Sequence, residues 1–356
     1  MTHPLHKSVC ALAVAAALVA GAAPALADGA IYVSNQGSGV AVLDAQKLAT
    51  VGQIDLKDSA PRGLAVTPDG KFLLTANLKT GDVAVIDTAT QKVVRRVPIG
   101  KNPEFLRILP DGSRAFVTYE PSSTGGPPKK EGRDAKDDDD DKLPGQVAVI
   151  DLKKWKVVAS IVGAPETEGI EFSPDAKRVA ITNEGNDTIT VYALPGNKLV
   201  KTVDLHVHGS RPRGIKVAPD GSHYVVTMEN SDSLVVLDPD FNFVKSVPTA
   251  KGPYGVAFDK GGQHIVVAAA RDGLVQVFDG ASYAKLADIP VGKRCWHFSY
   301  TPDESQLLVA CGRSNDVHVI DAASFKVTTT LSGFEQPWGV VAYPKTDGSL
   351  DAPVRR

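Results

Sequence analysis

Seven charged or aromatic residues recur along the chain at nearly constant intervals, and their side-chain types can do chemistry. The intervals between them are 42, 64, 45, 41, 42 and 42 residues. The set is Arg62, Glu104, Glu168, Arg213, Tyr254, Trp296 and Trp338. Carboxylates attract cationic groups, arginines attract anionic groups, and aromatic rings stack on flat or cationic ligands. Brought together, the seven would suit a small amphipathic, aromatic or cationic ligand.

Short apolar runs between turn signals must position these residues. Between Pro61 and Asn102 there are four such runs, rich in Val, Ile, Leu and Ala, and each ends at a cluster of Gly, Pro, Asp, Asn or Thr. Runs this short are typical of strands in an antiparallel meander rather than of helices. The stretch therefore predicts four strands.

The same pattern recurs down the chain and decides the fold class. Repeats begin at Pro61, Pro103, Thr167, Pro212, Pro253, Cys295 and Pro337. Six repeats are complete, and the seventh supplies only one strand before the chain ends. Three further strands are expected near the N-terminus, at Ala30–Asn35, Val40–Asp44 and Val51–Leu56. A composite sheet from both ends would close the ring and remove open sheet edges, so we predict an all-β, seven-bladed β-propeller of four-stranded antiparallel blades.

In a propeller the innermost strands converge on a central channel, so the seven recurring residues should line one channel mouth. The connection between the second and third strands of a repeat should open on the same side, because an antiparallel hairpin returns there. These connections contribute Asn35, Asn77, Glu120, Asn183, Glu184, Glu229, Asn230, Arg271 and Arg313, and His297 lies beside Trp296. We expect a ligand-binding cup from these residues. The alternative is that arginines and glutamates pair across the mouth while the aromatics fill a narrow channel.

The chain divides into one folded domain and three other segments. Residues 1–27 are typical of a signal peptide, with Lys7, an apolar stretch from Val9 to Ala20 and a terminal Ala25-Leu26-Ala27. The propeller is expected over 28–347, with a charged insert at 121–144 whose Pro, Gly and Asp content is typical of a flexible loop, and 348–356 form a tail. We expect export to the periplasm, with secretion as the alternative.

Composition narrows the possible partners. The formal charge of -2 shows no bias toward nucleic acid, and no further apolar stretch is long enough to span a membrane. We expect a small molecule or a periplasmic protein as partner, and a monomer.

Two cysteines remain after residue 27, and they flank a hairpin. Cys295 and Cys311 are centred on Asp303, which lies in the predicted turn, so they should face each other across two strands. In an exported protein this arrangement favours a structural disulfide, with a redox-active pair as the alternative. His206 and His208 alternate in an expected strand and could hold zinc or copper, or they form a solvated edge.

The repeat residues resemble a known family. A Pro-Asp-Gly turn followed by LLTAN, then GDVAVIDTAT and VPIGKNP, resembles the YVTN-repeat (YncE-like) propellers of exported bacterial proteins, and the likeness spans the chain after residue 27. It implies the propeller fold and leaves the activity open, because propellers host many activities. The insert and the Cys295-Trp296-His297 sequence depart from the Pro-x-Gly that usually begins a repeat.

These observations favour a binding or interaction module that works at the channel mouth. No cofactor is predicted. Calcium or zinc stay open, because Glu and Asn oxygens could hold an ion as in calcium-dependent lactonase propellers, although Arg62 and Arg213 would oppose it. The alternatives are a metal-assisted lactonase-type hydrolase and an accessory subunit of a periplasmic oxidoreductase system. A serine-hydrolase elbow of the Gly-x-Ser-x-Gly type is absent from the sequence.

Overall fold

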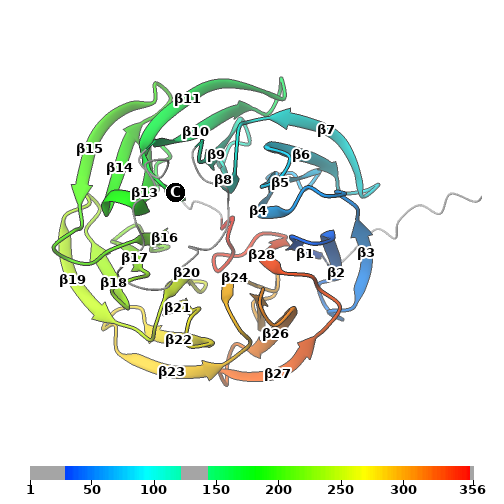
Figure 1. Cartoon of the computed structure of the whole chain (residues 1–356). Coiled ribbons are helices and arrows are strands. Elements are labelled where there is room, and N and C mark those ends of the chain that lie inside the picture. The colour runs from blue at the N-terminus through cyan, green and yellow to red at the C-terminus, as the bar shows by residue number, and fades with distance from the viewer. Residues whose placement is uncertain (1–28, 122–142, 353–356) are drawn as a thin grey trace, which may run out of the picture.

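The structure, a computed structural model, describes residues 29–121 and 143–352. Within them, seven four-stranded antiparallel sheets surround a central channel (Figure 1). The predicted seven-bladed propeller is therefore confirmed. The signal peptide and almost all of the charged insert lie outside the described residues.

The innermost strands line the channel and begin at the predicted repeat starts. They are β4 (Pro61–Val66), β8 (Pro103–Ile108), β12 (Thr167–Phe172), β16 (Pro212–Val217), β20 (Pro253–Phe258), β24 (Cys295–Tyr300) and β28 (Pro337–Tyr343). The second strands are β1 (Ala30–Asn35), β5 (Phe72–Asn77), β9 (Arg114–Tyr119), β13 (Arg178–Asn183), β17 (Tyr224–Met228), β21 (His264–Ala269) and β25 (Gln306–Cys311).

The third and outermost strands complete each blade. The third strands are β2 (Gly39–Asp44), β6 (Asp82–Asp87), β10 (Pro144–Asp151), β14 (Thr188–Ala193), β18 (Ser233–Leu237), β22 (Leu274–Asp279) and β26 (Asp316–Asp321). The outermost are β3 (Thr50–Ile54), β7 (Lys92–Pro98), β11 (Lys156–Pro165), β15 (Lys198–Asp204), β19 (Phe243–Pro248), β23 (Lys285–Pro290) and β27 (Lys326–Leu331). Blade 1 is β28 with β1–β3, and blades 2 to 7 follow in chain order.

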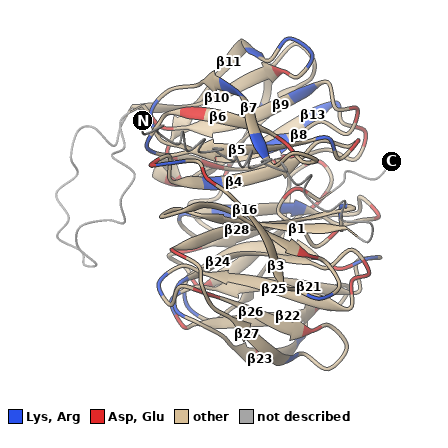
Figure 2. Ribbon diagram, turned by 90° about the vertical axis from the view of Figure 1, so that its right-hand side faces the viewer, with Lys and Arg blue, Asp and Glu red and all other residues tan. Residues whose placement is uncertain are grey.

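The core lies between the blades, and the burial of each strand explains its composition. The inner three strands of each blade are almost wholly buried and rich in Val, Ile, Leu and Ala, whereas outermost strands such as β27 are exposed along most of their length. Apolar side chains of neighbouring blades pack together, as Leu74 and Val85 of blade 2 do with Leu106 and Val117 of blade 3. Many of the charged residues, blue and red in Figure 2, lie in the connections at the two faces of the ring.

The two ends of the chain share blade 1, as predicted. Strand β1 pairs with β28 in antiparallel register, from Ala30 opposite Tyr343 to Asn35 opposite Pro337. Every blade therefore lies between two neighbouring blades, and the ring is closed. Closure fixes which residues reach the channel.

The residues after β28 turn back into the channel. We call the channel end where the innermost strands begin the upper mouth and the other end the lower mouth. Leu350 and Asp351, within the stretch predicted to be a tail, lie buried at the lower mouth (red in Figure 1). The Leu350 carbonyl accepts hydrogen bonds from Arg107 Nη1 and Lys216 Nζ, both at 3.0 Å. The C-terminal segment, Lys345–Ala352, thus closes this mouth.

Asp351 anchors the segment. Its Oδ2 accepts a hydrogen bond from the backbone N–H of Val66 at 2.9 Å and pairs with Lys345 Nζ at 2.8 Å. Burial alone would raise the pKa of Asp351, but Lys345 and these hydrogen bonds hold it below its usual value.

We therefore expect Asp351→Ala to lower the free energy of unfolding by about 2–4 kcal/mol, because it leaves the partly buried ammonium group of Lys345 and the buried N–H of Val66 unpaired. The measurement is denaturant unfolding at pH 7. Asp240→Ala is the matched control, since the Asp240 side chain is 81% exposed. Equal effects of the two substitutions would contradict the anchoring role.

Candidate functional site

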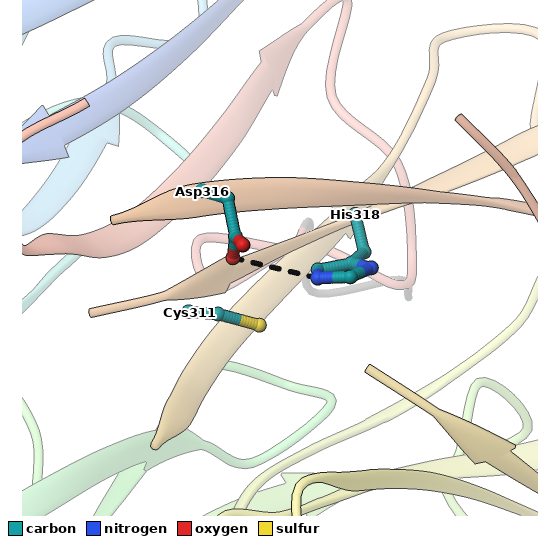
Figure 3. A group of neighbouring side chains, drawn as sticks. All are labelled: Cys311, Asp316 and His318. Carbon is teal, nitrogen blue, oxygen red and sulfur yellow. Dashed lines mark ion pairs between the residues drawn. The ribbon is translucent and has the colours of Figure 1, made fainter. Parts of the chain in front are cut away.

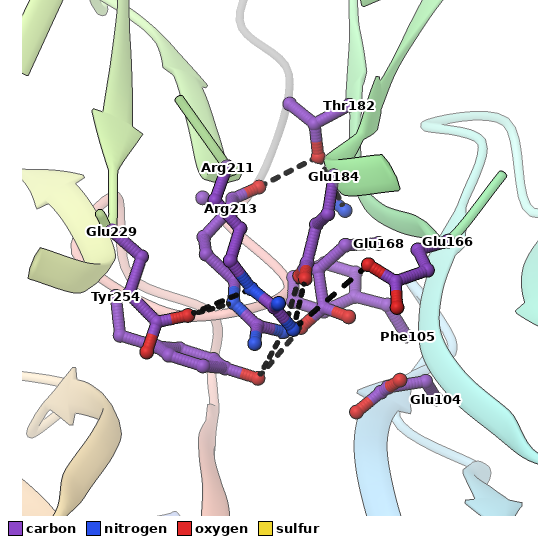
Figure 4. A network of polar contacts seen from close by, with 12 residues as sticks. Glu104, Phe105, Glu166, Glu168, Thr182, Glu184, Arg211, Arg213, Glu229 and Tyr254 are labelled. Carbon is purple, nitrogen blue, oxygen red and sulfur yellow. Dashed lines mark hydrogen bonds and ion pairs between the residues drawn. The ribbon is translucent and has the colours of Figure 1, made fainter. Parts of the chain in front are cut away.

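Charged residues gather at the upper mouth, and Figure 4 shows those of blades 3 to 5 with Tyr254 of blade 6. Arg62 pairs with Glu104 at 2.5 Å, and Arg213 pairs with Glu168 at 3.3 Å. The hydroxyl of Tyr254 donates to Glu168 Oε1 at 2.7 Å. Five of the seven recurring residues therefore contact at least one other member of the set.

Arg213 is the centre of the network. Its Nε donates to Glu229 at 2.7 Å, and its Nη1 contacts Glu168 and Glu184. The guanidinium also lies 4.5 Å from the ring centroid of Tyr254. Although burial alone would lower it, the pKa of Arg213 is raised by its carboxylates. Three carboxylates therefore surround Arg213 and compensate its charge.

Glu229 collects the arginines of blades 5 to 7. Besides Arg213, it lies 3.4 Å from Arg211, 3.4 Å from Arg271 and 3.3 Å from Arg294. Burial opposes ionisation, but Arg213 and Arg211 outweigh it and lower the pKa of Glu229 to about 2. This side of the mouth is therefore a saturated ion-pair cluster.

The opposite side, on blades 3 and 4, is an acidic sector of Glu104, Glu120, Glu166 and Glu168. Burial, and then the charge of Glu104, raise the pKa of Glu168 to about 8. The pKa of Glu120 is also raised well above its usual value by burial and by Glu104, Glu168 and Glu166. Glu120 accepts a hydrogen bond from the Asn102 amide at 3.1 Å, and within the described residues it has no ion pair.

An aromatic layer lies below the charged network. Phe105, Tyr254, His297 and Trp338 contact one another edge-on or tilted, with His297 and Trp338 centroids 4.3 Å apart. Burial, and then Lys216, lower the pKa of His297 well below its usual range, so this imidazole is neutral. Its Nε2 has no hydrogen-bond partner in the described part of the chain.

Trp338 and Trp296 play different parts. Trp338 is 2% exposed and fills the channel against His297, as expected for a packing residue. Trp296 is only half-buried and its ring lies against Gly312, where no Cβ could fit. Trp296 is therefore the recurring tryptophan that remains open to solvent.

Several predicted residues lie away from the network. Asn77 donates to Asp82 at 2.7 Å across the hairpin between the second and third strands of blade 2, and Asn183 bonds Thr188 in the same way in blade 4. Arg271, in contrast, belongs to the network through Glu229, and its exposed side chain also bonds Asn230 at 2.6 Å. Arg313 is exposed, and Asn35 is buried.

The placement of His206 and His208 in a strand is wrong. Strand β15 ends at Asp204, and both histidines lie in the turn that follows. His206 Nδ1 lies 3.2 Å from Asp187, and His208 stacks on Phe243 with centroids 3.6 Å apart. The shared face assumed for metal binding rested on that strand.

The sequence reasoning missed Glu166, Arg211 and Arg294, which occupy one repeat position. Each directly precedes an innermost strand and has a left-handed backbone, with φ of 53°, 63° and 55°. The remaining blades have positive φ at the same position, which is uncommon for residues other than glycine. The residue directly before each repeat start could therefore have been included among the candidates for the mouth.

Phe105 was also missed, although the sequence marks it. The third residue of an innermost strand is glycine in five blades: Gly63, Gly169, Gly214, Gly255 and Gly339. A Cβ there would meet the backbone of the next innermost strand, as at Gly63 beside Glu104. Only Phe105 and His297 break the pattern, and their rings meet in the channel with centroids 5.6 Å apart.

The comparisons with known sequences match part of the chain. The family described as "Lactonase, 7-bladed beta-propeller" matches residues 148–242. An uncharacterized protein, YncE, of Salmonella typhimurium is 25% identical over 185 residues, and that of Salmonella typhi is also 25% identical over 185 residues. Each alignment covers 50% of this chain and 46% of the relative, so the chain spans about half the length of the curated relatives it matches.

Solved structures share the fold over most of the chain. Kuenenia stuttgartiensis hydrazine synthase aligns with a TM-score of 0.70 and 21% identity, covering 82% of this chain and 92% of that one. The periplasmic gluconolactonase PpgL of Pseudomonas aeruginosa aligns with a TM-score of 0.69 and 18% identity, covering 88% and 98%. At these identities the likeness shows the fold alone.

Among the described residues, no helix is long and apolar enough to cross a membrane. The chain thus has the closed ring of a seven-bladed β-propeller, and it is similar in part to the lactonase-type propellers and to the two YncE proteins.

Proposed function

We propose that the protein is an exported binding module whose upper mouth holds a small organic cation in the acidic sector. The observation that carries the proposal is Glu120, a carboxyl group 7% exposed with no ion pair in the described residues and three glutamates nearby. A buried carboxylate is costly unless a cation compensates it. A cationic ligand would supply that charge.

The rest of the mouth supports a cation rather than an anion. Arg213 is enclosed by three carboxylates, and Arg62 is paired with Glu104. Trp296 offers a half-exposed ring at the same mouth, and aromatic faces attract cations. The lower mouth is closed by the C-terminal segment, so a ligand would enter and leave through the upper mouth.

Localisation to the periplasm is part of the same proposal. The Cys295–Cys311 disulfide is of the kind that persists in oxidising compartments, and the signal-like residues 1–27 agree with export. An accessory role beside a periplasmic oxidoreductase remains the protein-partner form of the proposal. Co-purification with a redox protein from the native host would support it.

The binding test uses choline and calcium as separate probes in titration calorimetry at pH 7. We expect choline to bind, and Glu120→Gln to weaken it at least about 30-fold, which corresponds to about 2 kcal/mol for an unpaired buried charge. Binding should release protons, because the cation lowers the pKa of Glu120. Glu335→Gln, at an exposed position on the rim, is the control.

Failure of both probes to bind would contradict a cation site. Binding of calcium but not of choline would mean that the site takes a metal ion rather than an organic cation. Equal affinities of the Glu120→Gln and Glu335→Gln variants would remove Glu120 from the site.

The acidic sector also predicts a pH dependence of stability. The pKa of Glu168 is about 8 in the folded protein and 4.5 when unperturbed, so between these values the folded state binds the extra proton. Stability from this group is full below about pH 4.5 and is lost as the pH rises. Glu168→Gln cannot ionise, so its melting temperature relative to wild type should increase from pH 5 to pH 7. A constant difference, as expected for Glu335→Gln, would contradict the raised pKa.

Lactone hydrolysis is the second candidate, favoured by the lactonase-type match over residues 148–242, which includes Glu168, Glu184, Arg213 and Glu229. A carboxyl group with a pKa near 8 can act as general acid at neutral pH. We expect δ-gluconolactone opening above the uncatalysed rate if this is correct, and Glu168→Gln should reduce it about 100-fold or more. The assay follows acid release with and without calcium. No acceleration would leave the binding proposal alone.

A further inference from the structure

Four side chains of metal-ligating types lie on one face of blade 7, away from the upper mouth network. Cys295 of β24 is opposite Cys311 of β25, and Cys311 is opposite Asp316 of β26. Directly opposed residues share a face of the sheet, and His318, two residues after Asp316, shares it too. The register alone therefore brings Cys295, Cys311, Asp316 and His318 together.

The distances suit one metal ion. The sulfur of Cys311, a carboxylate oxygen of Asp316 and a ring nitrogen of His318 all lie within 4.8 Å of one another (Figure 3). Asp316 Oδ1 and His318 Nε2 are 3.4 Å apart. Bonds of about 2.0–2.3 Å in a tetrahedral zinc site place ligand atoms roughly 3.5 Å from each other. Small side-chain movements would complete such a site.

Neighbouring groups already orient these ligands. Ser314 Oγ donates to Asp316 Oδ1 at 2.7 Å, and Thr330 Oγ1 lies 3.4 Å from His318 Nδ1. Second contacts of this kind fix the rotamer of a ligand and the tautomer of a histidine. The Asp316 and His318 side chains are 20% and 14% exposed, so an ion can approach from the edge of the blade.

While the disulfide is intact, two of the four side chains cannot bind a metal ion. Cys295 and Cys311 are joined, and a metal needs the thiolate rather than a disulfide sulfur. The fold does not demand the cross-link, because the same register position holds Pro61 opposite Asn77 in blade 2 and Pro253 opposite Ala269 in blade 6. The cysteine pair is specific to blade 7 and adds chemistry to it.

We propose that the dithiol form of the protein binds one zinc ion through Cys295, Cys311, Asp316 and His318. A dithiol reductant breaks the S–S bond by giving two electrons and two protons, and it becomes a disulfide itself. Zinc then displaces the two thiol protons and takes both thiolates, one nitrogen and one oxygen, a donor set that zinc accepts. Reoxidation to the disulfide, with two electrons passing to an oxidant such as another disulfide, releases the ion.

The experiment compares the disulfide and dithiol forms of the full chain in a Cys10→Ser background, so that only the two blade 7 thiols remain. Thiol titration of the unfolded, unreduced protein should find none. After reduction with a phosphine, zinc competition against a chromophoric chelator should show about one ion per chain. Cobalt(II) should give thiolate-to-metal charge-transfer absorption in the reduced form alone.

Two histidine variants separate the site from general surface binding. His318→Ala should weaken zinc binding at least tenfold in the reduced protein and leave the disulfide form unchanged. His264→Ala is the control, because His264 lies 2.6 Å from Asp259 in blade 6 without a nearby thiol pair, and it should bind zinc as wild type does.

Three results would overturn the proposal. One is equal zinc binding by the disulfide and dithiol forms. Another is the absence of thiolate–cobalt absorption in the reduced chain, whether circular dichroism shows that chain to be folded or unfolded. The third is a His318→Ala affinity equal to that of His264→Ala. Two free thiols in the unreduced chain would contradict the disulfide itself.

Discussion

The antiparallel pairing of β1 with β28 is the constraint on which the rest of the structure depends. It joins the first described strand to the last innermost strand, with Ile31 opposite Ala342 and Val33 opposite Val340. These residues are fully buried, so the pairing brings main-chain hydrogen bonds and apolar packing together. Without it the innermost strands would not converge, and neither the charged upper mouth nor the plugged lower mouth would exist.

Burying charged groups at the upper mouth costs desolvation free energy, and the ion pairs of the network offset most of it. Arg213 is enclosed by Glu168, Glu184 and Glu229, and such clusters stabilise weakly because desolvation cancels much of the attraction. The carboxylates instead fix the position of the guanidinium, with Glu229 on Nε and Glu168 and Glu184 on Nη1. On the acidic side that compensation is incomplete. Functional sites commonly carry uncompensated groups of this kind at the expense of stability.

Much of the fold could be read from the sequence, because the repeat is expressed in short-range signals. Turn residues and the phase of Val and Ile runs located every innermost strand, and the two incomplete ends required a composite blade. The cysteine pairing followed from a hairpin centred on Asp303, and the structure contains that disulfide.

The site was less accessible to sequence reasoning, for identifiable physical reasons. Glu166 and Arg211 reach the mouth from residues with a left-handed backbone directly before an innermost strand. Apart from glycine, no residue type in the sequence indicates that conformation. Side-chain direction also depends on the bulge that follows the first residue of most innermost strands, which strict alternation ignores. The repeat position alone does not fix exposure either: Trp338 is buried while Trp296 is only half-buried, although both hold the same position.

The C-terminal segment makes the stability of the protein depend on its last described residues. Arg107 and Lys216 are buried, and their hydrogen bonds to the Leu350 carbonyl exist only in a chain that reaches this residue. A chain cut short by premature termination or by trimming at this end would keep its blades and lose those bonds. Proteolytic surveillance acts on the less stable member of such a pair. A chain that reaches Leu350 would therefore outlast one that is cut before it.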